Sequence, residues 1–404
     1  MKSFDGMKGG AGGKGMAGGK GIASGKGGAS GKEVADGKGI ASGKGVAGGK
    51  EVADGKEIAS GKGGASGKGV AGGMKSPITG KPMKLVKEKK ALEFRKESFD
   101  IIHHSYRCED SGEEFVDEHL GDLNLDQVYN AYRVRHQLPF TEEIKEIRRQ
   151  YGLPATTMSE VLGFGINQYR LYETGEIPSE TNGRLIQMAA RPEEFLRLLE
   201  LSNALGDKEK GKLLKRIDEL KKERGAGSVI AEKTLGITMP SEYNGYRKTS
   251  PVKAYHMIRF FADTLTPLKT SLNKLLFYSD FYHFKRFGNG ISGLQYRAIQ
   301  WGPVPSQFDY LFKMAEENHI INLKYEVWDG DKEMVIIEPA AESLFRAELF
   351  TEEEIESLQD VLEKFKKTKT KQLVEISHNE PGWKANFEEK KLIPYTYAFD
   401  LLGL

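Results

Sequence analysis

A hexapeptide repeat fills the first 73 residues of this 404-residue chain and limits what that part can fold into. Lysine recurs every six residues from Lys2 to Lys68, and the segment holds 27 of the 48 glycines. Glycine loses more backbone entropy on ordering than other residues, and one small apolar side chain per repeat buries too little surface to compensate. We therefore expect residues 1–73 to be disordered. A hexapeptide β-helix is the alternative, because Val or Ile recurs at multiples of six from Ile22 to Ile58.

Charge is divided unevenly along the chain. Residues 1–73 contain 12 Lys and 6 acidic residues, which leaves 48 basic and 52 acidic residues downstream. Residues 74–404 carry no excess positive charge and cannot bind DNA through bulk electrostatics. Any DNA contact therefore needs a local basic patch and, we expect, a homodimer. The single cysteine excludes an internal disulfide. Without an apolar run of membrane-spanning length or a secretory signal, we expect a cytoplasmic protein with no membrane partner.

Residues 74–125 alternate apolar and polar side chains, which predicts a small antiparallel β unit. Two stretches, SPITG and YRCEDSG, have the frame of zinc knuckles. Structural zinc sites use thiolates, but only Cys108 supplies one here, and three ligand positions carry hydroxyls instead: Ser76, Thr79 and Ser111. We therefore expect neither a metal nor another cofactor. The adjacent His103 and His104 point to opposite faces of a strand, so we expect structural or exposed roles for them.

Residues 138–203 combine helix periodicity with a glycine turn. Met158, Val161 and Leu162 give one helix an apolar side, glycines follow, and Ile166 opens a second helix. This pattern predicts a helix-turn-helix, in which the first residues of the second helix enter the major groove. A plain helical hairpin is the alternative. The predicted DNA contacts are amides that can pair with adenine, followed by side chains suited to phosphates or bases: Asn167, Gln168, Tyr169, Arg170, Arg148 and Arg149.

Two connecting segments flank this region. Leu120–Gln137 is typical of a short polar helix or linker. Residues 204–249 begin with an amphipathic helix over Asp207–Arg224, whose apolar side could pair in a dimer. Glycines and prolines from Gly225 to Pro251 then predict an interdomain linker.

Residues 250–404 are rich in aromatic residues and helical patterns, and a hairpin is expected over Lys324–Pro339. We expect Trp301 to lie in the core. Five residues are candidates for acid–base or metal chemistry, although core, capping and turn roles explain each equally well: His256, Asp280, His283, His378 and Glu380. No nucleophile motif accompanies them, so we expect no catalytic residue.

Residues 74 to about 200 resemble the MqsA-like antitoxins through SPITG, YRCEDSG and LGFGINQYRLYETGEIP. In that family a small zinc-binding β domain precedes a helix-turn-helix of the Cro and lambda-repressor type. The resemblance implies a dimer that binds a palindromic operator and represses its own operon. Asn167 stands where the family has a base-reading asparagine. The arginine that the family has before its Tyr-Glu pair is Leu171 here, so the sequence preference is not carried over.

Residues 250–404 resemble the Panacea, or SocA-like, antitoxin domain through LNKLLFYSDFYHFKRFGNGISGLQYRAIQWGPVPSQFDYLF and EISHNEPGW. The resemblance implies a mostly helical domain that binds and neutralises a toxin encoded beside it. Toxins of this family differ widely and include small alarmone-synthetase-like enzymes, and one member delivers its toxin to a protease. We expect the toxin surface to include four aromatic residues: Tyr278, Tyr282, Phe284 and Tyr310.

Together these features predict a mainly α fold with a small β unit. The predicted function is a type II antitoxin whose C-terminal domain neutralises a protein toxin and whose helix-turn-helix represses its operon. The alternatives are a protease adaptor for the toxin, a transcriptional regulator that senses a phage or stress protein, and an enzyme using His256, His283 or His378.

Overall fold

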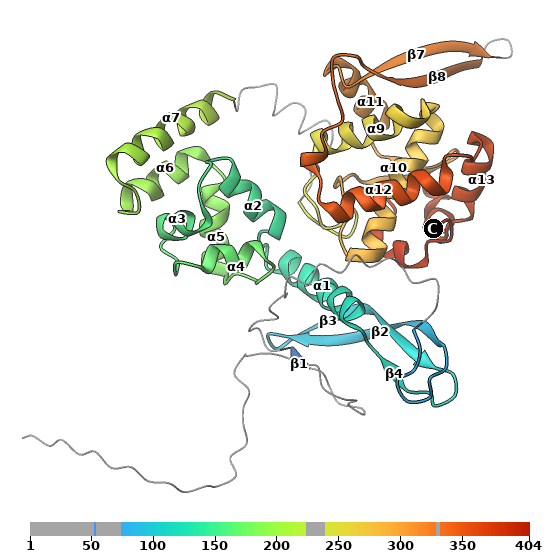
Figure 1. Cartoon of the computed structure of the whole chain (residues 1–404), viewed down its shortest axis with the longest axis horizontal. Helices are drawn as coiled ribbons and strands as arrows, with labels where there is room; N and C mark the ends of the chain where they lie inside the picture. Colours follow the sequence, from blue (N-terminus) through green and yellow to red (C-terminus); the bar gives the residue numbers. More distant parts are fainter. Residues whose placement is uncertain (1–51, 54–73, 224–238, 329–331) are drawn as a thin grey trace, which may run out of the picture.

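The computed structural model describes residues 52–53, 74–223, 239–328 and 332–404. The expectation for residues 1–73 falls outside this part of the chain, apart from Val52–Ala53. Figure 1 shows a sheet with one long helix along it, a helical unit and a larger C-terminal unit. Helices predominate and the sheets are small and mostly antiparallel, so the predicted mainly α fold class is confirmed.

The sheet is built around one long hairpin. Strands β2 (Met83–Phe94) and β3 (Glu97–Cys108) pair antiparallel over their full length. Strand β4 (Glu114–Phe115) pairs antiparallel with β3, and β1 (Val52–Ala53) pairs parallel with the end of β2. The predicted antiparallel β unit is thus confirmed. Its turn places Arg95 and Lys96 at positive φ, where glycine would normally be preferred.

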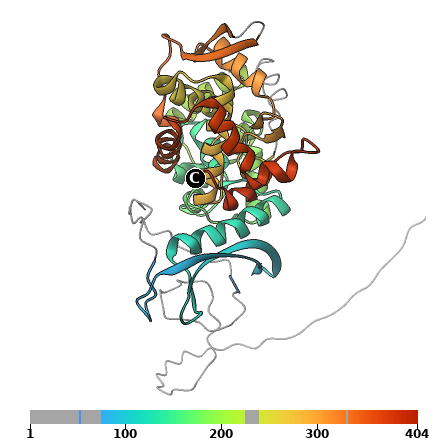
Figure 2. The same cartoon turned by 90° about the vertical axis from the view of Figure 1, so that its right-hand side faces the viewer.

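Helix α1 (Glu118–Arg135) lies along the sheet (Figure 2) and is an integral part of the fold. The side-chain amide of Asn124 accepts from the backbone N–H of His104 at 2.8 Å and donates to its C=O at 2.9 Å. Gln127 binds the backbone of Ile102 in the same way, at 3.0 and 2.9 Å. The two amides therefore occupy the edge of β3 much as a neighbouring strand would.

The other residues of α1 reach both remaining units. Leu120 and Leu123 belong to the C-terminal core, and Asn130 donates to the carbonyl of Gly288 at 3.0 Å. Arg133 donates to the carbonyl of Gly175 at 2.8 Å. The segment predicted as a polar helix or linker is helical, but its buried contacts make it a shared support for the other parts.

The helical unit has a core to which each of its described helices contributes: α2 (Thr141–Arg149), α3 (Ala155–Val161), α4 (Gln168–Glu173), α5 (Glu180–Ala189), α6 (Pro192–Leu201) and α7 (Asp207–Glu223). Leu213, Ile217 and Leu220 of α7 are buried in this core. The expectation that this face of α7 is free for dimer pairing is therefore wrong, because α6 and the rest of its own chain already cover it.

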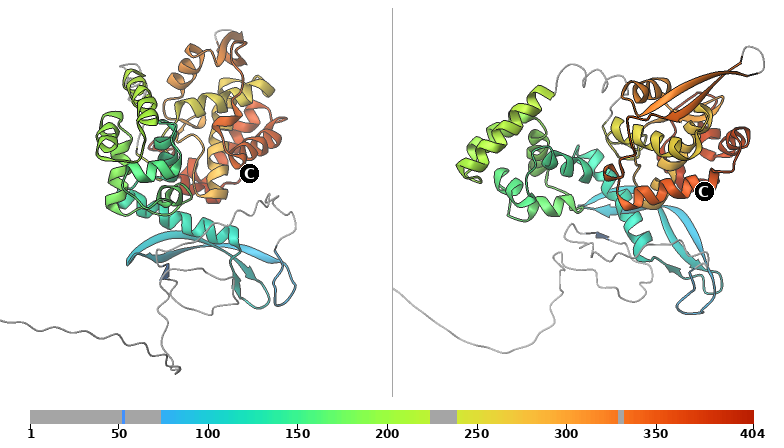
Figure 3. Two further views of the ribbon diagram at one scale, coloured as in Figure 1. Left: turned by 60° about the vertical axis from the view of Figure 1, so that its left-hand side comes forward. Right: turned by 45° about the horizontal axis from the view of Figure 1, so that its top comes forward.

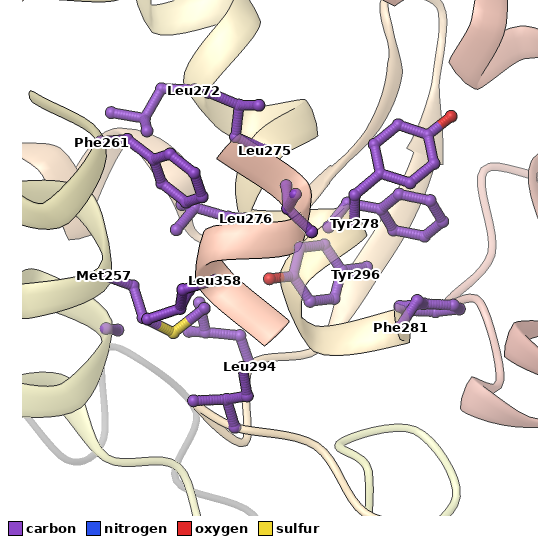
Figure 4. Close-up of a cluster of buried hydrophobic side chains, with 14 of the residues drawn as sticks. Met257, Phe261, Leu272, Leu275, Leu276, Tyr278, Phe281, Leu294, Tyr296 and Leu358 are labelled. Atoms are coloured by element: carbon purple, nitrogen blue, oxygen red, sulfur yellow. The ribbon is translucent and has the colours of Figure 1, made fainter. Parts of the chain in front are cut away.

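The C-terminal unit surrounds helix α10, whose apolar side chains pack with residues of α9, β5 and α12 in the cluster shown in Figure 4. Its helices are α9 (Pro251–Leu265), α10 (Lys269–Phe287), α11 (Phe308–Glu317), α12 (Glu352–Phe365), α13 (Thr370–Asn379) and α14 (Pro381–Asn386). Two hairpins and two 3-10 helices complete it: β5 (Tyr296–Ile299) with β6 (Gly302–Pro305), β7 (Ile321–Trp328) with β8 (Lys332–Pro339), η1 (Ala347–Leu349) and η2 (Tyr395–Asp400). The hairpin expected over Lys324–Pro339 is confirmed.

Residues 239–250, predicted as the second half of a linker, pack into the C-terminal unit. Gly290 donates its N–H to the carbonyl of Gly245 at 2.8 Å, and the hydroxyl of Thr249 donates to Gly293 at 2.8 Å. Gly245 has a φ of +63°, and a Cβ there would lie 2.7 Å from the backbone nitrogen of Gly290. The glycine is therefore needed for close packing rather than for the flexibility of a linker.

We expect Asn124→Ala to lower the free energy of unfolding by about 2–4 kcal/mol, because the N–H and C=O of His104 would be buried without partners. Chemical denaturation of the full chain measures this change. Asp122→Ala, on the exposed side of α1, is the matched control and should change stability by no more than about 0.5 kcal/mol. Equal stability of the two variants would contradict the role assigned to Asn124.

Candidate functional site

Helices α3 and α4 are fixed against each other by buried polar contacts. The hydroxyl of Ser159 on α3 accepts the N–H of Tyr169 on α4 at 2.9 Å. The turn between them contains Gly163 at a φ of +71°, as the glycine break predicts. Met158, Val161 and Leu162 are buried, so the predicted apolar side is confirmed. The second helix begins at Gln168 rather than at Ile166, which leaves Ile166 and Asn167 in the turn.

The predicted DNA contacts separate into exposed and buried residues. Asn167, Arg170 and Arg149 are exposed, and Gln168 is half-buried with its amide donating to the carboxylate of Glu176 at 2.9 Å. Ile166 is 60% exposed directly beside them. Sequence reasoning assigned Ile166 to the helix start, and the flanking residues gave no signal that its side chain is exposed.

Two of the predicted DNA contacts are structural instead. Tyr169 is fully buried and its hydroxyl donates to the carbonyl of Ile144 at 2.7 Å, so its ring is enclosed by the unit's own core. Arg148 donates to both carboxylate oxygens of Glu173, at 2.6 and 3.1 Å, and to the carbonyl of Leu153 at 2.8 Å. Since these bonds hold α2 against α4, we remove both residues from the DNA-contact set.

The two knuckle-like loops face each other across the end of the sheet. The hydroxyl of Thr79 lies 3.3 Å from the sulfur of Cys108, and Ser76 accepts the N–H groups of Ile78 and Thr79. Hydrogen bonds from Ser111 and Thr79 lower the pKa of Cys108 to about 6. The two loops thus bring Thr79 next to Cys108, and their hydroxyls hydrogen-bond to the sulfur and the backbone. No cluster of three His, Cys, Asp or Glu side chains suited to a metal occurs among the described residues.

Both neighbouring histidines of β3 are buried. The ring of His104 packs edge-on against Phe399 of the C-terminal unit, with centroids 4.6 Å apart. Burial lowers the pKa of His104 to about 4. Its neutral ring therefore contributes to the packing between the sheet and the C-terminal unit.

The four aromatic residues expected to contact a toxin also differ in exposure. Tyr278 and Phe284 are buried in the core around α10, so we remove them from the contact surface. Tyr282 and Tyr310 are half-buried at its margin, and the hydroxyl of Tyr282 donates to Asp360 at 3.1 Å. Helix α10 is buried on nearly all sides, which explains why its aromatic residues are poor contact candidates.

Trp301 is 63% exposed, so the expectation that it lies in the core is wrong. It occupies the turn between β5 and β6, where a side chain can point away from both strands. Trp383 is half-buried nearby, with its indole N–H donating to the carbonyl of Ile299 at 2.9 Å and its ring stacked on His378 at 4.2 Å. Trp301 is therefore an exposed aromatic side chain on a well-supported turn.

Asp280 and Glu380, two of the candidates for acid–base chemistry, organise irregular segments. Asp280 is fully buried and accepts the N–H groups of Ile291 and Ser292 and the hydroxyls of Ser292 and Tyr296, at 2.5–2.8 Å. Glu380 accepts from the hydroxyl of Tyr278 and, at the end of the chain, from the N–H groups of Leu402 and Gly403, each at 2.9 Å. Saturated with internal donors, both carboxylates act as structural acceptors.

The histidine candidates are not brought together. His283 is buried on α10, with its Nδ1 3.0 Å from the hydroxyl of Ser357, and burial lowers its pKa well below the ordinary value. His256 lies on α9 near Phe345, and His378 stacks on Trp383. Burial lowers the pKa of both, which favours the neutral form of each ring. The described structure shows no shared site for the three.

Lys274 is an unusual residue that sequence reasoning missed. It is fully buried on α10, and its amine donates to the carbonyl of Pro303 at 2.9 Å. Burial lowers the pKa of Lys274 to about 7. Gly302 closes over it, since a Cβ there would lie 2.7 Å from Cε of Lys274 and 2.6 Å from the hydroxyl of Ser377. The amine thus fastens β6, and with it the turn of Trp301, to the central helix.

Comparison with known proteins identifies the C-terminal part. Residues 272–384 match the family described as Antitoxin SocA-like, Panacea domain. No curated protein and no solved structure matches the chain. The match confirms the Panacea resemblance for this part and supports an antitoxin role; the MqsA-like resemblance stays a prediction.

The matched Panacea segment contains most of α10, both hairpins and α11–α13, and so includes Lys274, Asp280, Trp301 and Glu380. The Panacea domain is not a known enzyme family, in keeping with side chains that serve packing and loop anchoring. Within the described residues, no helix is both long and apolar enough to cross a membrane.

The lowered pKa of Lys274 predicts a pH-dependent stability. Its ordinary pKa of 10.5 applies to the unfolded chain, so between pH 7 and 10 the unfolded state binds a proton that the folded state does not. This contribution makes the free energy of unfolding rise with pH, by about 1.4 kcal/mol per pH unit. Lys274→Met should remove that slope in denaturation measured from pH 7 to 9. Lys269→Met, at the partly exposed start of the same helix, is the control; parallel profiles for all three proteins would contradict a neutral buried amine.

Proposed function

We propose that this protein is a type II antitoxin with two binding regions. The Panacea domain neutralises a protein toxin by direct contact, and the unit of helices α2–α6 binds operator DNA and represses the operon. The observation that carries the proposal is the Panacea match at residues 272–384 in a chain that also contains a helix-turn-helix-like pair, α3 and α4.

The toxin surface that we propose centres on Trp301. A large aromatic side chain exposed on a fixed turn is a suitable anchor, because it buries much apolar surface on binding and has few rotatable bonds to restrict. Lys274 and Trp383 hydrogen-bond to the two strands that flank this turn. Helix α13, which packs against β6, carries an open depression of about 460 Å³ on its surface. The half-exposed Tyr282 and Tyr310 complete the candidate contacts.

The toxin proposal is tested with the full chain and the protein encoded beside it, co-expressed in growing cells. We expect restored growth and co-purification of the two proteins. Trp301→Ala should weaken the complex by roughly thirtyfold, about 2 kcal/mol, as at other interface anchors. Leu201→Ala, an exposed apolar residue of α6, is the control.

Persistent growth arrest with the unmodified chain would refute neutralisation. Toxin abundance is followed in the same cultures, because loss of the toxin without a stable complex would indicate a protease adaptor instead.

The DNA surface that we propose is the exposed start of α4. Asn167 and Gln168 would pair with adenine edges, and Ile166 would contact a thymine methyl group. For Gln168 this requires release of its bond to Glu176. Arg149 and Arg170, both exposed, would contact phosphates on either side.

The DNA proposal is tested by binding of the full chain to a duplex from upstream of its own gene and to a scrambled duplex. Asn167→Ala with Gln168→Ala should cost about 1–3 kcal/mol per lost base contact on the first duplex only. Arg170→Ala should weaken binding to both duplexes and reduce the slope of log affinity against log salt concentration by about one. Arg197→Ala, exposed on α6, is a charge-matched control. Unchanged affinity of the double variant for both duplexes would refute the assignment.

A further inference from the structure

The β7–β8 hairpin extends from the Panacea domain (Figure 3), and within the described residues no further strand pairs with the outer edge of β7. The orientation of its backbone groups follows from three hydrogen bonds. The backbone N–H of Ala340 donates to the carbonyl of Ile320 at 3.3 Å, and this pair continues the register of the hairpin. Even-numbered residues of β7 therefore direct their N–H and C=O groups toward β8. Ile337 donates to Pro267 outside the hairpin at 2.9 Å, and its pairing partner Leu323 donates to the carboxylate of Glu316 at 2.9 Å. Odd-numbered residues of β7 therefore direct their N–H and C=O groups outward.

Tyr325 and Val327 share this outward orientation, because backbone groups alternate along a strand. Within the described residues, the N–H of neither residue donates a hydrogen bond to another part of the chain. An open strand edge of this kind can pair with another strand. Pairing there would add to the hairpin without disturbing the bonds between β7 and β8.

The side chains of this edge are apolar on one face and charged on the other. Tyr325 is 58% and Val327 77% exposed, on the face that continues from the buried Ile321. On the opposite face the amine of Lys324 lies 2.8 Å from the carboxylate of Glu326. The apolar face that packs on the core at the base of the hairpin thus continues outward without cover.

The segment from Leu323 to Val327, LKYEV, is complementary to itself when run antiparallel. A two-fold axis at Tyr325 sets Lys324 opposite Glu326 of a second copy and Leu323 opposite Val327 of that copy. The outward groups of the two Tyr325 residues then form a reciprocal hydrogen-bonded pair. Each exposed Val327 comes to lie beside Leu323 of the other copy, at the edge of that copy's core.

We propose that the protein forms a two-fold dimer through β7, in which the two hairpins join into one four-stranded antiparallel sheet. A second copy provides partners for the apolar face, for the charges and for the outward groups of Tyr325 and Val327, as a self-complementary interface requires. The N–H of Leu323 would exchange its bond to Glu316 for one to the carbonyl of Val327 in the second copy. The proposal depends neither on a toxin nor on DNA, so it can fail while either binding function stands.

Charge reversal at the edge tests the dimer, with the mass of the full chain followed by light scattering over a range of concentrations. The wild type should dimerise. Lys324→Glu and Glu326→Lys each place like charges opposite one another twice per dimer, so each should weaken association roughly tenfold. The double variant restores opposite charges and should dimerise again. An equimolar mixture of the two single variants should form a heterodimer for the same reason.

Tyr325→Pro provides a second test that does not depend on charge. It removes an outward N–H and leaves the hydrogen bonds between β7 and β8 in place, so the variant should be folded by circular dichroism and monomeric. Lys313→Glu, an exposed charge reversal on α11, should dimerise like the wild type. A monomeric wild type, including one that pairs this edge with another protein, overturns the proposal. So does a dimer that Tyr325→Pro and both single charge variants leave unchanged.

Discussion

The arrangement of this protein depends on a row of buried polar side chains along α1. Asn124, Gln127, Asn130 and Arg133 recur at every third residue, and each hydrogen-bonds to the backbone of a neighbouring element. A buried amide or guanidinium without a partner is costly, so each of these bonds fixes the helix at one register against its neighbour. The same helix therefore positions the sheet, the helical unit and the Panacea domain.

The sequence predicted features that depend on local pattern. Helical spacing placed Met158 and Val161 inside, strand alternation predicted the N-terminal β unit, and alternation with turn residues located the β7–β8 hairpin. It failed where long-range contacts decide the outcome. Residues 239–250 look like a linker by composition, yet Gly245 is there because the backbone at Gly290 approaches too closely for any side chain. Such an approach joins distant segments and leaves no trace in local periodicity.

The candidate contact residues show a similar division. Helix periodicity cannot distinguish core from surface on a helix that is buried nearly all round, so Tyr278 and Phe284 of α10 were assigned to the surface from their residue type alone. Trp301 was assigned to the core by the same reasoning, although a turn between two short strands can direct a large side chain outward. In the helical unit, Asn167 and Tyr169 are only two residues apart, but Asn167 is exposed and Tyr169 is buried on the inner side of α4.

Buried polar groups also determine the surface that the Panacea domain presents. Asp280 binds donors from the loop after α10, Glu380 binds the last residues of the chain, and Lys274 binds the strand beside Trp301. Each connects an irregular segment to the regular core, where a purely apolar contact would allow the segment to shift. A surface fixed in this way loses little conformational entropy when a partner binds, so a small number of exposed aromatic contacts can supply specific affinity.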